Sequence, residues 1–211
     1  MTIKAVLFDM DGVLIDAKEW HYEALNRALS LFGFEISRDT HLATFDGLPT
    51  RNKLDILSKT RHLPRRLHPL IKTLKQFYTV QMAHAHCSPM FHHQYALAKL
   101  KSERYRLAVC SNSVRETVSL MMQLSGLDKY MERQFSNEDV THSKPDPEMY
   151  LLAMEQLDVK PEETLILEDN DHGIEAAIKS GAHLLHVNSV HDATYSRIRA
   201  RINEIQQLQQ S

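Results

Sequence analysis

Short runs of apolar residues recur along the chain, each followed by polar residues and then by a helical pattern. The runs predict buried strands at residues 3–8, 106–110, 164–167 and 184–187, with a weaker candidate at 133–136. Apolar residues at helical spacing fill residues 114–124, 147–157 and 171–180. Strands that alternate with helices indicate βαβ units, which build a parallel sheet covered by helices on both faces.

Residues 17–87 interrupt this alternation. They contain helical patterns at 19–33 and 67–84 and no convincing strand. We therefore expect an α/β fold with a Rossmann-like three-layer core and a small all-helical cap domain inserted after the first strand. The core would comprise residues 1–16 and 88–211, and the cap residues 17–87. The two connections, near Asp16-Ala17 and Cys87-Ser88-Pro89, would act as hinges.

Three aspartates, Asp9, Asp11 and Asp16, follow the first strand within eight residues. Burying a carboxylate is costly unless a positive charge or a proton compensates it. In an extended backbone Asp9 and Asp11 share one face, and Gly12 then allows a sharp turn. Two carboxylates on one face suit a nucleophile and a general acid/base that act on the same group. The alternative interpretation is an ordinary surface turn.

A hydroxyl follows the second strand, at Ser111. Because the carboxyl ends of parallel strands meet at one edge of the sheet, this hydroxyl is a candidate donor to a phosphate oxygen. Ser113 and Glu116 have the spacing of a capping box, so we expect a helix to begin there. For Ser113 the capping role is the preferred interpretation.

Charged residues also stand near the later strand ends. Lys144 lies just before a predicted helix that has Asp146 as its N-cap and Pro147 as its first residue. Glu168 and Asp169 directly follow the strand at 164–167. Carboxylates from two strand ends form a site for a hard divalent cation, and Mg²⁺ fits because it is held by a few carboxylates, water and substrate phosphate.

The order of these residues resembles the haloacid dehalogenase superfamily, and specifically its β-phosphoglucomutase-like, or CbbY-type, branch with a helical cap. Four segments carry the resemblance over essentially the whole chain: DMDGVLID, CSNS, SKPDPEMY and LEDNDHGIEAAIKSGA. The resemblance implies that Asp9 attacks phosphorus and forms an aspartyl-phosphate. It implies that Asp11 serves as acid and then base, which leads us to expect an environment that raises the pKa of Asp11.

The resemblance also implies the ligands of the site. Mg²⁺ would be held by the Asp9 carboxylate, the Asp11 carbonyl and Asp169, with Glu168 in a supporting position or as an additional ligand. Phosphate oxygens would be held by Ser111, Asn112 and Lys144. In the cap, His21 and Arg51 would contact the substrate, although the spacing at Arg51 is one residue longer than in the family and exposure to solvent is a nearly equal interpretation there.

Two departures favour hydrolysis over phosphoryl transfer between sugar positions. The mutase has a threonine where this chain has Ala17, and a lysine where it has Val114, followed here by Arg115. We therefore expect a Mg²⁺-dependent phosphatase of a small phosphorylated metabolite, a sugar or polyol phosphate. A sugar phosphomutase is the alternative. A dehalogenase would lack Asp11, and a catalytically inactive binding protein would not retain every catalytic position.

The composition of the chain limits the classes of binding partner that we expect. The 211 residues carry a net charge of −2, which argues against nucleic acid or an acidic membrane, and no apolar run has the length of a membrane span. Two cysteines, Cys87 and Cys110, without an export signal favour the cytoplasm. Either a monomer or a homodimer fits. Among 13 histidines, one cluster could bind metal but is better explained as exposed linker and helix-start residues: His84, His86, His92 and His93, with Cys87.

Overall fold

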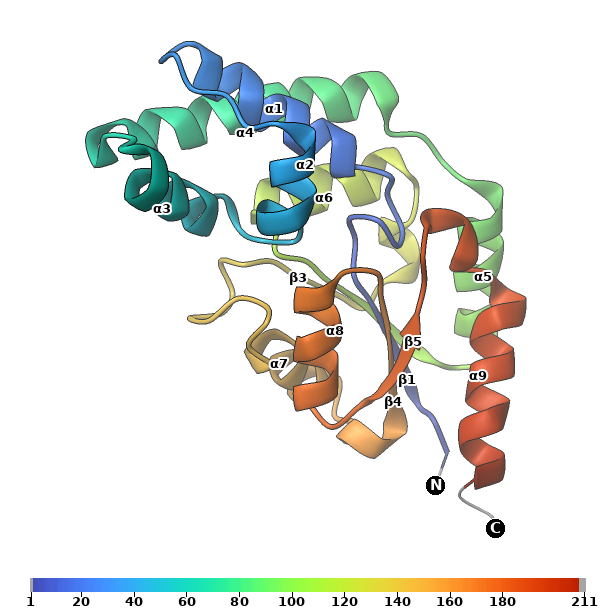
Figure 1. Cartoon of the computed structure of the whole chain (residues 1–211). Coiled ribbons are helices and arrows are strands. Elements are labelled where there is room, and N and C mark those ends of the chain that lie inside the picture. The colour runs from blue at the N-terminus through green and yellow to red at the C-terminus, as the bar shows by residue number, and fades with distance from the viewer. Residues whose placement is uncertain (1, 209–211) are drawn as a thin grey trace.

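The computed structural model describes residues 2–208 (Figure 1). Within this range the chain forms one five-stranded sheet in the order β3-β2-β1-β4-β5, and every pairing is parallel. The first strand therefore lies at the centre of the sheet, which places the residues that follow it between two other strand ends. The strands are β1 (Ala5–Phe8), β2 (Arg106–Cys110), β3 (Arg133–Phe135), β4 (Thr164–Glu168) and β5 (His183–His186).

Alternate side chains of the central strands enter two separate hydrophobic cores. In β1, Val6 and Phe8 belong to one core, whereas Ala5 and Leu7 belong to the other. This alternation follows from the period of two in a strand, and burial on both faces explains why the strands read as continuous apolar runs.

Helices cover the two faces of the sheet and complete the three layers. One core receives side chains from α5 (Phe91–Ser102), α6 (Arg115–Leu124) and α9 (Tyr195–Leu208). The other receives side chains from α7 (Glu148–Gln156) and α8 (Asp171–Lys179). The predicted α/β class with a parallel sheet is confirmed.

The helical segment after β1 has a third hydrophobic core of its own, which includes Leu25, Leu54 and Ile71. Figure 1 shows these helices above the carboxyl ends of the strands. This arrangement supports the proposed cap, whose boundaries at residues 17 and 87 stay a prediction. Its helices are α1 (Lys18–Ser30), the single turn α2 (Arg38–Thr40), α3 (Thr50–Arg61) and α4 (His68–His86), with a π-helical turn at His41–Phe45.

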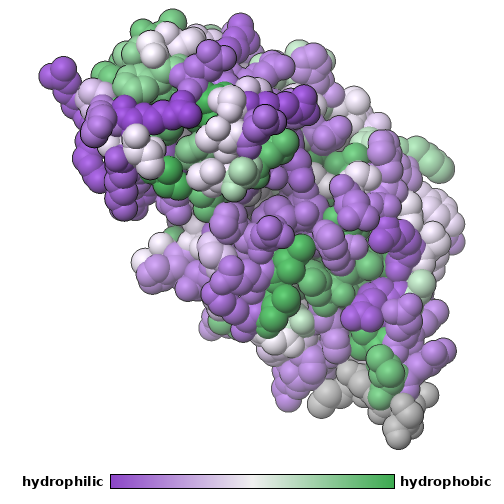
Figure 2. Space-filling model, in the orientation of Figure 1, coloured by the Kyte–Doolittle hydropathy of each residue, from purple (hydrophilic) through white to green (hydrophobic). Residues whose placement is uncertain are grey.

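The predicted elements agree with the structure to within one or two residues at most ends, whereas α3, α5 and α9 were not predicted. On the face seen in Figure 2, hydrophilic residues dominate and hydrophobic ones form small separate patches. Among residues 2–208, no helix combines the length and the apolar character needed to cross a membrane.

Candidate active site

The carboxyl ends of β1, β2 and β4 bring the predicted site residues together. The register pairs Phe8 with Val109 on one side and with Leu167 on the other. The residues that follow these three positions therefore emerge at the same level of the sheet. In this way Asp9 comes to lie between the segment that carries Ser111 and the segment that carries Asp169, although Asp9 and Asp169 are 160 positions apart along the chain.

Lys144 is the buried counter-charge of this edge. Its ammonium donates to Asp9 Oδ1 at 2.7 Å, to Glu168 Oε1 at 2.6 Å and to the Cys110 carbonyl at 2.7 Å. All three protons of the ammonium are thus used within the protein. Glu168 is completely buried and also accepts a hydrogen bond from the Tyr150 hydroxyl. The ammonium of Lys144, which the ends of β2 and β4 hold in place, is therefore the positive charge that compensates the buried aspartate.

Negative charge nevertheless exceeds positive charge around Asp9. Carboxylate oxygens of Asp9, Glu168 and Asp169 lie within 4.8 Å of one another. Burial and the neighbouring Glu168 raise the pKa of Asp9 well above its ordinary value, although Lys144 opposes this shift. A divalent cation at these oxygens would balance the remaining charge and favour the ionised nucleophile. The donor set therefore fits Mg²⁺, which prefers carboxylate oxygens.

Gly12 is required by the close approach of two loops. Its φ is +93°, which favours glycine, and a Cβ there would lie 2.0 Å from Asp169 Oδ2. The same oxygen lies 2.6 Å from Lys18 Nζ, a contact that the sequence did not predict. Burial raises the pKa of Asp169, although Lys18 opposes the shift.

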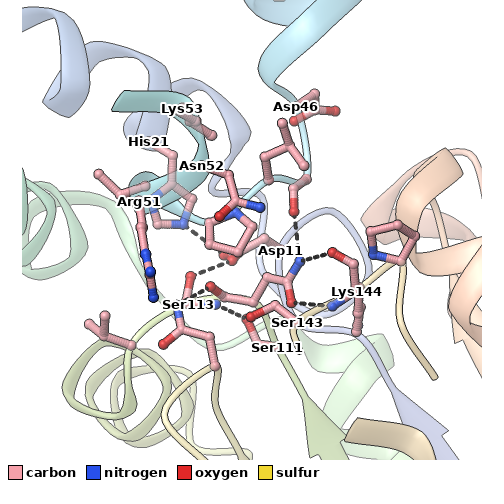
Figure 3. Close-up of a pocket in the computed structure, with 18 of the residues that line it drawn as sticks. Asp11, His21, Asp46, Arg51, Asn52, Lys53, Ser111, Ser113, Ser143 and Lys144 are labelled. Atoms are coloured by element: carbon pink, nitrogen blue, oxygen red, sulfur yellow. Dashed lines mark hydrogen bonds and ion pairs between the residues drawn. The ribbon is translucent and has the colours of Figure 1, made fainter. Parts of the chain in front are cut away.

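Asp11 lies under the cap, where its carboxylate contacts His21 and Ser113 and not Lys144 (Figure 3). Its Oδ1 is 3.1 Å from His21 Nε2, and its Oδ2 accepts a hydrogen bond of 2.9 Å from Ser113 Oγ. On the far side of the imidazole, Lys75 Nζ lies 3.0 Å from His21 Nδ1. The cap histidine is therefore held between a cap lysine and a core aspartate.

This environment corrects two expectations. Burial alone would raise the pKa of Asp11, but His21 and the Ser113 hydroxyl outweigh burial and leave the pKa below its ordinary value. The expected rise is therefore wrong for the protein without ligands. Ser113 does not cap a helix either, because α6 has Val114 at its N-cap and no side-chain cap bond. The Ser113 hydroxyl is turned toward Asp11 instead.

The loop after β2 joins the core to the cap. Ser111 is buried, and its hydroxyl accepts a hydrogen bond of 3.0 Å from Ser113 N. The Asn112 amide donates to the Gly47 carbonyl at 2.9 Å and to the Lys144 carbonyl, and accepts from Lys144 N. The side chain of Asn112 is thus engaged in holding loops together. The contacts of these residues with phosphate stay a prediction.

A cavity of about 1030 Å³ separates this edge of the sheet from the cap. Figure 3 shows His21, Arg51 and Lys53 on the cap side, facing Asp11 and Lys144 across it. Arg51 is exposed at the cavity wall, so its role in binding stays a prediction. Lys53 and Lys75 were missed, because only the packing of α3 and α4 places them here.

The histidine cluster has a different environment from the one expected. His93 is only 1% exposed, and its Nε2 contacts the Val190 carbonyl at 2.7 Å. The expectation that it lies in an exposed linker is wrong, because α5 packs this residue against the segment before α9. His84 and His86 are exposed. Among the described residues, the carboxylates of Asp9, Glu168 and Asp169 are the one grouping suited to a metal ion.

Carboxylates, a hydroxyl and a buried ammonium that converge on the carboxyl edge of a parallel sheet define an α/β enzyme with its site at the switch in strand order. Residues 6–187 match the haloacid dehalogenase-like hydrolases, and the chain belongs to this family.

Individual relatives agree with this assignment. The chain is 31% identical over 196 residues to "Phosphorylated carbohydrates phosphatase" of Thermotoga maritima, across 90% of this chain and 88% of that protein. It is 30% identical over 178 residues to "Pyrophosphatase PpaX" of Oceanobacillus iheyensis, across 82% and 78% of the two chains. The fold resembles that of β-phosphoglucomutase from Clostridium difficile, with a TM-score of 0.84 at 20% identity over 96% and 98% of the chains. The predicted family and the predicted class, a phosphoric monoester hydrolase, are confirmed.

Proposed function

We propose that this protein is a Mg²⁺-dependent phosphatase of a small phosphorylated sugar or polyol, and that it acts through an aspartyl-phosphate on Asp9. The observation that carries the proposal is the buried Asp9–Lys144 pair, 2.7 Å apart, beside the carboxylates of Glu168 and Asp169. The names of the relatives, a phosphatase of phosphorylated carbohydrates and a pyrophosphatase, support the class of substrate.

The chain's own groups can perform both half-reactions. An oxygen of the Asp9 carboxylate forms a bond to phosphorus while the ester oxygen leaves and takes a proton from Asp11. Water then attacks the same phosphorus, gives its proton to Asp11 and releases Asp9 and inorganic phosphate. Asp11 is held ionised by His21 and Ser113 in the free protein, and the negative charge of an arriving phosphate would raise its pKa toward the protonated form.

Mg²⁺ would be held by the Asp9 and Asp169 carboxylates and the Asp11 carbonyl, and it would supply positive charge that stabilises the transferring phosphoryl group. Lys144 opposes protonation of Asp9 and orients its carboxylate. Ser111 is placed to donate to a phosphate oxygen. Positioning and charge neutralisation of this kind supply most of the rate in phosphoryl transfer.

A sugar phosphomutase is the rival proposal. It would need a cation near Val114 to hold a second phosphate during reorientation of the intermediate. Arg115, the next residue, is exposed and pairs with Asp139 at 2.6 Å, which directs it away from such a role. This observation supports hydrolysis.

The test is phosphate release from a panel of sugar, polyol and amino-alcohol phosphates, measured with Mg²⁺ and with a chelator. We expect release that requires the cation and that is lost in Asp9→Asn. Phosphorus NMR of the same reactions distinguishes the rival, because a new sugar phosphate with little free phosphate would establish a mutase. Undiminished release by Asp9→Asn would contradict the nucleophile assignment.

A further inference from the structure

Lys18 is a lysine of the cap that contacts a proposed metal ligand of the core. It is the first residue of α1, and its ammonium lies 2.6 Å from Asp169 Oδ2 and 3.7 Å from Asp46 Oδ2. The side chain of Asp169 is only 1% exposed, whereas that of Lys18 is 33% exposed. The contact joins the cap to the end of β4, and the proposed catalytic steps make no use of it.

The helix itself gives no reason for a cation at this position. The amino end of a helix carries a partial positive charge, which disfavours a lysine in the first turn. The N-cap residue, Ala17, makes no side-chain cap bond that would compensate for this. The favourable interaction of Lys18 is therefore its contact with Asp169 and not one within α1.

The backbone at Gly12 leaves room for the lysine. A Cβ at Gly12 would lie 2.6 Å from Lys18 Cε and 2.0 Å from Asp169 Oδ2. A larger residue there would therefore displace both partners of the ion pair. The side chain of Lys18 reaches Asp169 close to the loop that carries Asp11, whose carbonyl is a proposed ligand of Mg²⁺. The ammonium thus lies among the ligands that the proposed function assigns to the metal ion.

Both oxygens of Asp169 have a partner within the protein. Oδ1 accepts a hydrogen bond of 3.2 Å from Asn170 Nδ2, and Oδ2 contacts the ammonium of Lys18. Mg²⁺ binds carboxylate oxygens at about 2.0–2.1 Å and demands near-octahedral geometry. A divalent cation that approaches Asp169 therefore meets an ammonium on the same carboxylate, and like charges at such short range repel each other. Asn170 is neutral, so Lys18 is the partner that opposes the metal ion.

We propose that Lys18 competes with Mg²⁺ for Asp169, and that Asp46, on the cap side of the cavity (Figure 3), receives the ammonium when the metal ion binds. The inference rests on the Mg²⁺ site of the proposed function and adds a residue that sets how much Mg²⁺ the protein requires. The four-carbon stem of a lysine is flexible enough to move its ammonium between neighbouring carboxylates. The affinity for Mg²⁺ would then be reduced in proportion to the fraction of molecules in which Lys18 has left Asp169.

Calorimetric titration with Mg²⁺, without substrate, measures the competition. Lys18→Met removes the charge and keeps nearly the length of the side chain. We expect it to bind Mg²⁺ about 10-fold more tightly than the wild type, the low end of the range for a charged hydrogen bond, because the lysine is partly exposed. Lys72→Met is the matched control, since Lys72 is an exposed lysine of the same cavity and its loss changes the net charge equally. The control should bind within about twofold of the wild type, because solvent screens an exposed charge.

Asp46→Asn tests the second position of the ammonium. Without this carboxylate the displaced lysine has no anionic partner, so Mg²⁺ should bind about two- to fivefold more weakly than to the wild type. In the Lys18→Met background the same change should have a smaller effect, because Asp46 acts through the lysine. Equal effects in the two backgrounds would show that Asp46 does not receive the ammonium.

Amine labelling of the wild type provides a measurement that needs no variant. The reactivity of Lys18, quantified by mass spectrometry, should rise when Mg²⁺ saturates the protein and return when a chelator removes it, while that of Lys72 stays constant. Unchanged reactivity at saturation, or an affinity of Lys18→Met no higher than that of the wild type, would overturn the competition and leave the phosphatase proposal intact.

The two proposals can also fail in the opposite order. Tighter binding of Mg²⁺ by Lys18→Met, with no compound of the phosphate panel hydrolysed, would overturn the phosphatase proposal and support the competition. If neither the wild type nor Lys18→Met binds Mg²⁺, the competition is wrong together with the metal site. Phosphate release in the presence of a chelator would then show that the hydrolysis itself does not depend on that site.

Discussion

Replacement of Lys144 by methionine would remove the buried cation that pairs with Asp9. Methionine has nearly the length of lysine, so the change deletes the charge without opening a large cavity. Two carboxylates, Asp9 and Glu168, would then face each other without the ammonium that lies 2.7 and 2.6 Å from them. The Cys110 carbonyl would lose its donor as well.

The expected loss of stability is large. Removing one partner of a buried ion pair costs about 3–5 kcal/mol, because the remaining charge stays buried without compensation. A domain of ordinary stability has about 5–15 kcal/mol in total. With a urea dependence of about 2 kcal/mol per molar, the unfolding midpoint should fall by roughly 2 M.

The loss should also depend on pH. Burial already raises the pKa of Asp9, and loss of Lys144 raises it further, so the folded variant binds more protons than its unfolded chain above about pH 4. Stability of Lys144→Met should therefore fall as pH rises, and its deficit should be larger at pH 8 than at pH 5. In the wild type, burial lowers the pKa of Lys144, but Asp9 and Glu168 outweigh burial and raise it above the ordinary value, so the lysine stays charged over this range.

Urea unfolding followed by circular dichroism, with a chelator present at pH 5 and pH 8, measures both effects. Lys179→Met is the matched control, because Lys179 forms an exposed pair with Glu175 on α8 and should contribute less than about 0.5 kcal/mol. The double variant Lys144→Met/Glu168→Gln should recover part of the loss. A deficit below about 1 kcal/mol, or one that is equal at the two pH values, would refute the view that Lys144 compensates buried negative charge.

Three further results are expected. Asp9→Asn should lower phosphate release on the order of 10³-fold or more while leaving the circular dichroism spectrum unchanged, and residual activity near the wild-type level would exclude Asp9 as nucleophile. Gly173→Ala, although alanine is the better helix former, should destabilise the protein by about 1–3 kcal/mol, because a Cβ would lie 2.0 Å from Glu168 Oε1; a more stable variant in urea unfolding would contradict this packing. Burial, together with His92, lowers the pKa of His93 to about 4, whereas the pKa in the unfolded chain is about 6.5. Between these values the unfolded chain binds one more proton than the folded protein. The free energy of unfolding of the wild type should therefore fall as the pH drops from about 6.5 to 4. His93→Gln should show a shallower fall in urea midpoint over that range, and an unchanged slope would assign the proton to another group.

The core of the fold could be predicted because its signals are local. The strands β1, β2 and β4 are buried on both faces and appear as apolar runs, and the site residues follow directly at their ends. The helix α9 was missed although Ile198, Ile202 and Ile205 have helical spacing, because charged residues between them obscure the pattern. The apolar positions of α5 are fewer and interrupted by histidines, which gives a weaker signal.

The cap side of the site could not be predicted in the same way. The contact of His21 with Asp11, and that of Lys75 with His21, depend on how α1 and α4 pack over the sheet. No local pattern specifies that packing. The expected rise in the pKa of Asp11 was wrong for this reason. The expectation considered only the surroundings of Asp11 within the core and not its contact with His21 of the cap. Lys53 resembles a surface lysine in the sequence, because Arg51, Asn52 and Asp55 lie close to it.

The same contacts make the chemistry of the core depend on the position of the cap. His21 belongs to α1 and Lys75 to α4, whereas Asp11 belongs to the loop after β1. Any displacement that separated α1 from that loop would remove the imidazole that lowers the pKa of Asp11, and it would leave the Ser113 hydroxyl as the remaining hydrogen-bond donor to that carboxylate. The protonation of the acid/base residue therefore depends on the position of the cap, because α1 provides the imidazole that contacts it.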